Sequence, residues 1–147
     1  MAEESTPSLN VRQAVPFLAV SSMEGSLRFY LDGLGFRMAK NWMVEGQVRW
    51  CWLEIGDAAL MLQEFRTEGE GAWKPDGKVG EGVTIFFICE DALALYREFK
   101  SRSIDVSTPY VGNAMWVTGV KDPDGYRLEF ESETETPEGT VFSGQEA

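Results

Sequence analysis

The feature that most constrains the fold of this chain is an internal repeat, because one order of segments occurs twice. In each half, an apolar run precedes a helical stripe, and three strand-like runs follow. The first half has its expected segments at 11–20, 23–34, 36–44, 48–55 and 58–65. The second half has them at 83–89, 92–99, 104–111, 114–120 and 126–131. Each half therefore has the order βαβββ, and the repeat predicts two copies of one module in a single domain.

Capping and turn residues support these segments. Ser21 and Glu24 have the spacing of a capping box at the start of the first helix, and Gly35 follows the last residue of its apolar stripe. Asp91 can cap the second helix in the same way. The sequence DPDG at 122–125 predicts a turn into the last strand.

Composition divides the chain further. We expect a flexible N-terminus at 1–10, module one at 11–65, a glycine-rich linker at 66–82, module two at 83–131 and an acidic tail at 132–147. In the tail, the apolar pair Val-Phe is a candidate to dock on the domain.

The chain contains no histidine and has a formal net charge of −11. Much of the acidity lies in the two terminal segments, and an acidic chain is not expected to bind nucleic acid. No apolar run is long enough to span a membrane, the N-terminal residues are not those of a secretory signal, and Cys51 and Cys89 lack metal-site or redox spacing. These features predict a cytoplasmic protein.

Four stretches then match one family pattern. They are VPFLAV at 15–20, SLRFY at 26–30, LGF at 34–36 and DPDGYRLEF at 122–130. With the repeat, they resemble the opening and closing signatures of the vicinal oxygen chelate superfamily, which includes glyoxalases, bleomycin resistance proteins and extradiol dioxygenases. The resemblance covers about residues 12–131 and implies an α+β fold in which two βαβββ modules form an incomplete barrel around a cleft. It also implies a homodimer.

The same resemblance implies where a metal ion would bind in catalytic relatives. The four ligand positions fall on Val15, Met61, Thr84 and Glu129, of which only the last is a strong donor. Because a divalent ion of this class requires several nitrogen or carboxylate donors, we expect no metal and no other cofactor. Gln63 or Glu64 would take a ligand position if the register of the fourth strand were shifted. Glu129 is the only candidate acid or base, and a structural ion pair is an equal alternative for it.

Strand alternation extends these positions into a predicted ligand cleft. In 48–55 it places Trp50 and Trp52 on one face and Arg49 on the other. Core packing remains an alternative for each tryptophan, and Trp73 in the linker is either a cover for the cleft or a surface anchor. The expected ligand-binding residues are Phe17, Trp50, Trp52, Met61, Gln63, Phe86, Trp116, Arg127 and Glu129.

Three functions follow from these expectations. The first is metal-independent binding of a small hydrophobic or aromatic molecule, similar to the antibiotic-sequestering bleomycin-resistance branch and favoured by the aromatic side chains. The second is a metal-dependent lyase, isomerase or dioxygenase of the glyoxalase type with an atypical ligand set. The third is a structural or regulatory module whose cleft no longer binds a ligand. Whether the chain is an enzyme stays open, although a binding protein is favoured.

Overall fold

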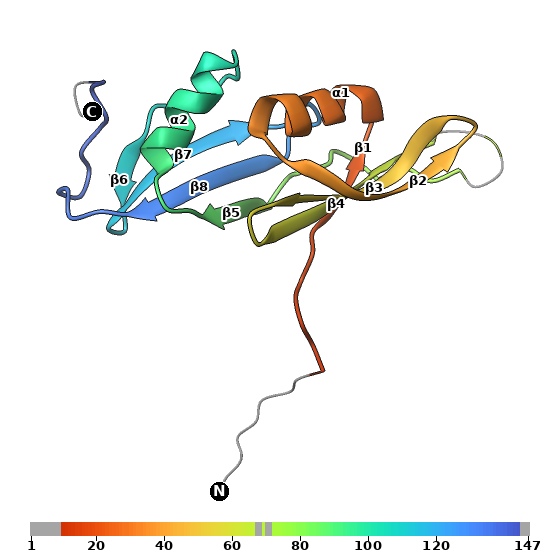
Figure 1. The fold of residues 1–147 in the computed structure, drawn as a ribbon, viewed down its shortest axis with the longest axis horizontal. Coiled ribbons are helices and arrows are strands. Elements are labelled where there is room, and N and C mark those ends of the chain that lie inside the picture. The colour runs from red at the N-terminus through yellow and green to blue at the C-terminus, as the bar shows by residue number, and fades with distance from the viewer. Residues whose placement is uncertain (1–9, 67–68, 70–71, 145–147) are drawn as a thin grey trace, which may run out of the picture.

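The computed structural model describes residues 10–66, 69 and 72–144. Each half of the chain forms a four-stranded sheet with one helical segment against it (Figure 1). Module one consists of β1 (Phe17–Val20), α1 (Met23–Leu27), its π-helical continuation η1 (Arg28–Leu34), β2 (Arg37–Val44), β3 (Gln47–Ile55) and β4 (Ala58–Glu64). Module two consists of β5 (Thr84–Ile88), α2 (Ala92–Ser101), β6 (Tyr110–Gly112), β7 (Met115–Lys121) and β8 (Arg127–Glu133).

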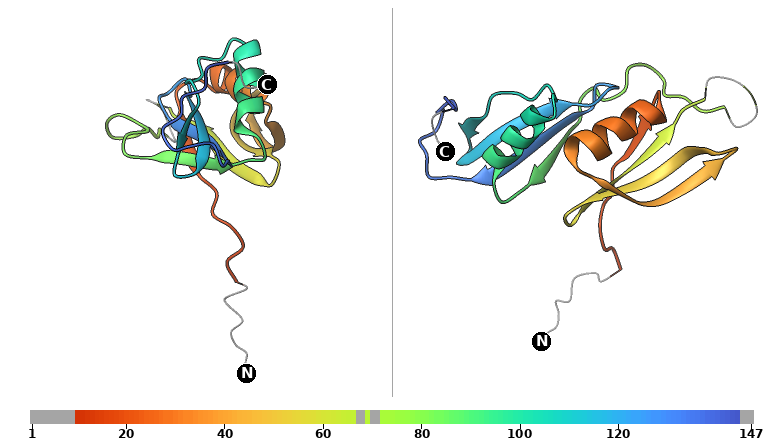
Figure 2. Two further views of the ribbon diagram at one scale, coloured as in Figure 1. Left: turned by 90° about the vertical axis from the view of Figure 1, so that its left-hand side faces the viewer. Right: turned by 45° about the horizontal axis from the view of Figure 1, so that its top comes forward.

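The two sheets have the same topology. Their strand orders are β1-β4-β3-β2 and β5-β8-β7-β6, and in each sheet the first and last strands of the module pair in parallel. The predicted α+β fold with two βαβββ modules is confirmed. The sheets lie next to each other along the long axis without closing into a barrel, and both helical segments cover the same side of the molecule (Figures 1 and 2). Each sheet therefore has one face under a helix and one open face.

Two expected strands are shorter in the structure. The first begins at Phe17 rather than at residue 11, directly after Pro16. The expected strand 104–111 is reduced to β6 and one isolated bridge between Val106 and Val120. Pro109 immediately precedes β6, and because proline lacks an amide hydrogen it cannot donate a ladder hydrogen bond there.

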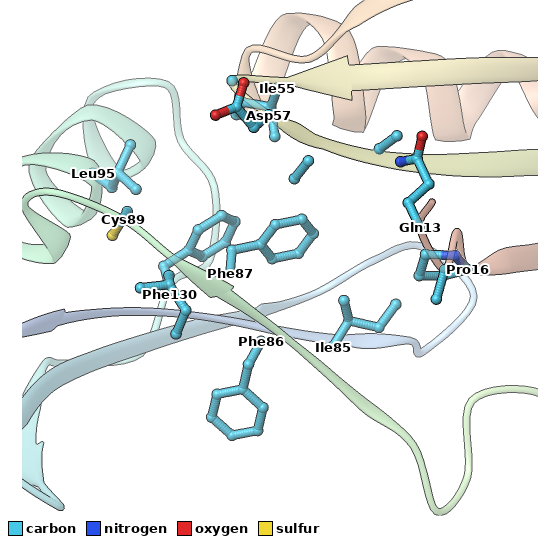
Figure 3. A pocket seen from close by; sticks show the side chains of 15 residues that line it. Gln13, Pro16, Ile55, Asp57, Ile85, Phe86, Phe87, Cys89, Leu95 and Phe130 are labelled. Carbon is cyan, nitrogen blue, oxygen red and sulfur yellow. The ribbon is translucent and has the colours of Figure 1, made fainter. Parts of the chain in front are cut away.

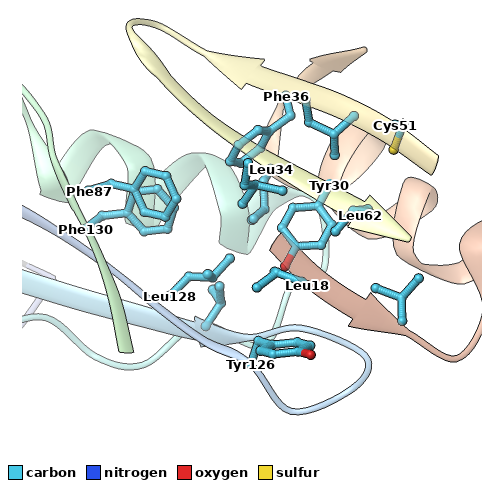
Figure 4. Packing of buried hydrophobic residues seen from close by; sticks show 14 of the residues in the cluster. Leu18, Tyr30, Leu34, Phe36, Cys51, Leu62, Phe87, Tyr126, Leu128 and Phe130 are labelled. Carbon is cyan, nitrogen blue, oxygen red and sulfur yellow. The ribbon is translucent and has the colours of Figure 1, made fainter. Parts of the chain in front are cut away.

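One hydrophobic core joins the two modules (Figure 4). Phe87 and Phe130 of module two stack with ring centroids 5.0 Å apart, and Phe36 of module one meets Phe87 edge-on at 5.9 Å. Leu62 of module one and Leu128 of module two belong to the same buried cluster. The buried cluster is therefore continuous across the two modules.

Polar contacts fix the same junction. The Tyr30 hydroxyl donates to Oδ2 of Asp122 at 2.8 Å, and Oδ1 of Asp122 accepts from the amides of Asp124 and Tyr126 at 2.9 Å each. The Tyr126 hydroxyl bonds both the amide and the carbonyl of Ala19 in β1 at 3.0 Å. Burial raises the pKa of Asp122 and of Tyr30 above their ordinary values. The DPDG turn thus connects module two to the edge strand of module one.

The C-terminal segment folds back on module two. The amide of Phe142 donates to the carbonyl of Pro109 at 2.9 Å, and Val141 forms a bridge with Tyr110. The Phe142 ring meets Trp116 edge-on at 6.1 Å. The apolar pair of the tail therefore docks, and it covers Trp116. Residues 1–9 of the expected flexible N-terminus lie outside the described residues.

None of the helices among the described residues has the length and apolar composition needed to cross a membrane.

Candidate functional site

The open face of module one carries two adjoining rows of side chains. In the first row, Trp50 of β3 lies between Trp42 of β2 and Gln63 of β4, because these residues are register partners. In the second row, Met61 lies between Trp52 and Phe17. Register partners on neighbouring strands point to the same side of a sheet. We call these six residues the aromatic face.

The edge of the second row is polar. Trp52 donates from Nε1 to Oε2 of Glu54 at 2.9 Å, and Nζ of Lys40 lies 4.6 Å from the centre of the Trp52 ring. Arg37 forms an ion pair with the same glutamate. These contacts hold the Trp52 ring in one orientation and bring positive charge to its surface.

The linker contributes one more aromatic ring to this face. Arg66 and Trp73 form a two-residue antiparallel bridge, with amide-to-carbonyl distances of 2.7 and 2.8 Å. This bridge places the Trp73 ring 5.9 Å from the ring of Phe17. Of the two alternatives for Trp73, the structure therefore favours a cover over the open face.

Beside the first row lies a cavity of about 200 Å³. It is lined by Trp42, Val44, Arg49, Gln63, Glu64, Arg66 and Trp73. Strict alternation predicted that Arg49 points away from Trp50, and this prediction is wrong. The pairing of β2 with β3 shifts at Arg49, which is the extra residue of a β-bulge, and a bulge changes the side to which its residue points.

The open face of module two combines charged side chains with the exposed rings of Phe86 and Tyr110. Glu129 pairs with Phe86 on one side and with Gly119 on the other. Its carboxylate lies 3.7 Å from Nη2 of Arg127 and is mostly buried. A Cβ atom on Gly119 would come within 3.1 Å of Oε2 of Glu129, so this glycine leaves the space that the carboxylate occupies. Glu129 therefore has a structural ion pair, which was the alternative to a ligand contact.

A groove of about 700 Å³ separates the modules (Figure 3). Its walls come from the chain before β1, the turn between β3 and β4, and β5 with Leu95 and Phe130 behind it. Cys89 lines the groove and is half-buried, and its burial raises the pKa of the thiol. Of the expected ligand-binding residues, only Phe86 lines this groove.

The structure thus divides the expected site among four places. Phe17, Trp50, Trp52, Met61 and Gln63 lie together on the aromatic face. Arg127 and Glu129 lie on the open face of module two, and Phe86 lies between that face and the groove. Trp116 lies under α2, because it pairs with Ser132 on the helix-covered side of the sheet. The open-face neighbours of Glu131 and Glu129 in β7 are Val117 and Gly119 instead. In the structure, the nine expected residues therefore do not line one cleft.

The donor set does not fit the metal ion that the family implies. Glu129 is held against Arg127, and its counterpart in module one, Met61, packs in the aromatic face. Glu64, the alternative ligand, accepts a hydrogen bond from the Met23 amide at 2.8 Å. Nowhere in residues 10–66, 69 and 72–144 do three His, Cys, Asp or Glu side chains come together in a way that could hold an ion.

These features define the class of protein: an α+β chain of two joined βαβββ modules, each with one open sheet face. The chain matches the family model "Glyoxalase/Bleomycin resistance protein/Dioxygenase superfamily" over residues 12–130. It therefore belongs to this superfamily, as the resemblance of its sequence motifs implied. A search of curated proteins finds no match.

Solved structures share this fold at low sequence identity. TioX from Micromonospora sp. ML1 is 17% identical with a TM-score of 0.67, over 84% of this chain and 99% of that one. TnmS3, an antibiotic binding protein from Streptomyces sp. CB03234, is 17% identical with a TM-score of 0.62, over 84% and 98%. A lactoylglutathione lyase from Agrobacterium tumefaciens is 19% identical with a TM-score of 0.57, over 82% and 94%. At these identities the likenesses establish the fold alone.

Proposed function

We propose that this protein binds a small planar aromatic molecule on the aromatic face without a metal ion. The observation that carries the proposal is the strand register, which brings Phe17, Met61 and Trp52 into one row and Trp42 and Trp50 into the next. Strands are about 4.8 Å apart and alternate residues about 7 Å apart, so the two rows form a surface of roughly 14 by 7 Å. That area suits a fused-ring molecule.

The chemistry of this surface supports the proposal. Phe17 and Trp42 have 48% and 58% of their surface exposed, and they belong to one contiguous face, which is the arrangement typical of a binding site. Aromatic rings bind other aromatic rings by stacking or edge-on contact, and they lose little conformational entropy when they do so. A ligand that covered these rings would therefore remove apolar surface from water.

Two further points accompany this function. TnmS3, which has the same fold, is an antibiotic binding protein by name, and this supports an antibiotic as a ligand for the present chain. A homodimer and a cytoplasmic location, expected from the sequence, stay predictions; light scattering of the purified chain measures the first.

A thermal-shift screen of planar aromatic compounds in the presence of EDTA tests the proposal. A ligand that binds only the folded state raises the melting temperature with its concentration. We expect ligands whose shift decreases in Trp50→Ala and persists in Phe86→Ala, because the second substitution removes an exposed ring from a different face. A shift lost in Phe86→Ala and kept in Trp50→Ala would move the site to module two. No shift with any compound would refute ligand binding of this kind.

A further inference from the structure

We propose that the ligand of the aromatic face carries an anionic group, such as a carboxylate, which binds Arg49 and Arg66 in the 200 Å³ cavity beside Trp42 and Trp73. This inference rests on the proposed function and adds the class of ligand. The formal net charge of the chain is −11, and this charge by itself gives no reason to expect an anionic ligand.

The guanidinium group of Arg49 is only partly hydrogen-bonded. Its Nε atom is buried and has no hydrogen-bond partner, and Nη2 makes one long contact of 3.4 Å to the carbonyl of Glu64. Buried polar atoms in proteins nearly always have a partner, and a guanidinium group has five N–H donors to satisfy. Arg49 therefore has donor capacity that the described part of the protein leaves unused.

The described residues that line the cavity carry more positive than negative charge. Neither Arg49 nor Arg66 forms an ion pair within the described residues, whereas Arg37 on the same sheet face pairs with Glu54. Among the described residues that line the cavity, Glu64 is the only acidic one, and its Oε2 accepts a hydrogen bond from the Met23 amide at the start of α1. Its carboxylate is thus already hydrogen-bonded to the backbone.

The cavity brings aromatic rings and guanidinium groups together. Trp42 and Trp73 line it together with the two guanidinium groups, and the side chain of Gln63 adds an amide. Guanidinium groups bind carboxylates in a planar, often bidentate geometry and stack on aromatic rings. A flat molecule with its ring over Trp50 and an anionic group at its edge would satisfy both kinds of contact at once.

The test compares two probes of the same shape, naphthalene-2-carboxylate and neutral naphthalene-2-carboxamide, by isothermal titration. A charge-assisted hydrogen bond pair is expected to make the carboxylate bind about tenfold tighter or more. Arg49→Gln should bring the two affinities close together by weakening the binding of the carboxylate probe. Arg66 is exposed, so the variant Arg66→Gln should fold normally, and it should reduce the difference between the two affinities in part. Arg28→Gln is the matched control, since it removes the same charge from the helical side, where Arg28 pairs with Glu24.

Each outcome decides between the two claims. Equal binding of both probes by the unmodified protein would overturn the anionic subsite and leave the aromatic face intact. A carboxylate preference that survives both Arg49→Gln and Arg66→Gln would place the anion elsewhere and also overturn the inference. Failure of both probes to bind would overturn the proposed function with it.

Discussion

The hydroxyl of Tyr126 is predicted to contribute more to stability than a single surface group should, because it connects the two modules. It donates to the carbonyl of Ala19 and accepts from the amide of the same residue, at 3.0 Å in both cases. β1 is an edge strand, so these two backbone groups have no other strand to bond. Tyr126→Phe removes both hydrogen bonds and leaves a buried amide and carbonyl without partners.

The expected cost follows from these contacts. Two neutral hydrogen bonds, together with the desolvation of the groups left behind, amount to about 2–3 kcal/mol. For a chain of this size, that loss lowers the melting temperature by roughly 5–10 °C. Urea unfolding followed by tryptophan fluorescence measures the free energy directly.

The matched control is Tyr110→Phe, which deletes the same atom from a tyrosine that is 46% exposed and makes no hydroxyl hydrogen bond within the described residues. We expect a change of less than about 0.5 kcal/mol there. If Tyr126→Phe were no more destabilising than this control, the account of the junction would be wrong. A core shared by the two modules also predicts that the unmodified protein unfolds in a single transition. Two separate transitions would contradict the shared core.

Three other perturbations give measurable results. Gly119→Ala should cost about 1–3 kcal/mol in urea unfolding, since its Cβ would crowd the Glu129 carboxylate at 3.1 Å; an unchanged midpoint would contradict the packing. Iodoacetamide at pH 8 should modify Cys89 well before Cys51, whose pKa burial raises to about 11, as mass spectrometry can follow; labelling at equal rates would refute this. Burial raises the pKa of Asp122 above its ordinary value of 3.8, so the folded protein keeps this carboxyl group protonated to higher pH than the unfolded chain does. The contribution of Asp122 to the free energy of unfolding should therefore decrease as the pH rises through and above 3.8. Asp122→Asn should remove that decrease from unfolding curves between pH 4 and 7, and identical pH dependence in both proteins would contradict it.

The sequence predicted the features that depend on regular periodicity. The repeated βαβββ order, the Asp91 cap of α2 and the DPDG turn all follow from local patterns, and the alternation in β3 correctly placed Trp50 and Trp52 opposite Cys51. The predicted Ser21 cap of α1 is wrong by one residue, because the hydroxyl of Ser22 accepts the hydrogen bond, from the Gly25 amide. Cys51 is buried in the core, whereas the two tryptophans are only partly buried.

The features that the sequence did not predict depend on contacts between residues far apart in the chain, which no local pattern reveals. The bulge at Arg49 arises from the pairing of β2 with β3, and Trp73 reaches the aromatic face through a bridge formed by the linker. Trp116 is buried because α2 and the docked Phe142 cover its side of β7, and alternation alone does not say which face of a strand a helix will cover. A glycine-rich linker with a single tryptophan was the available signal for Trp73, and an arginine beside two tryptophans was the signal for Arg49.

The central claim is that the aromatic face of module one binds an aromatic ligand and that no metal ion takes part. Isothermal titration of EDTA-treated protein with naphthalene-2-carboxylate tests it most directly, in the unmodified chain and in Trp50→Ala. We predict the same affinity with and without EDTA, and binding about tenfold weaker, ~1.4 kcal/mol, in Trp50→Ala. Binding that disappears with EDTA and returns with a divalent ion, or that is unchanged in Trp50→Ala, would contradict the account.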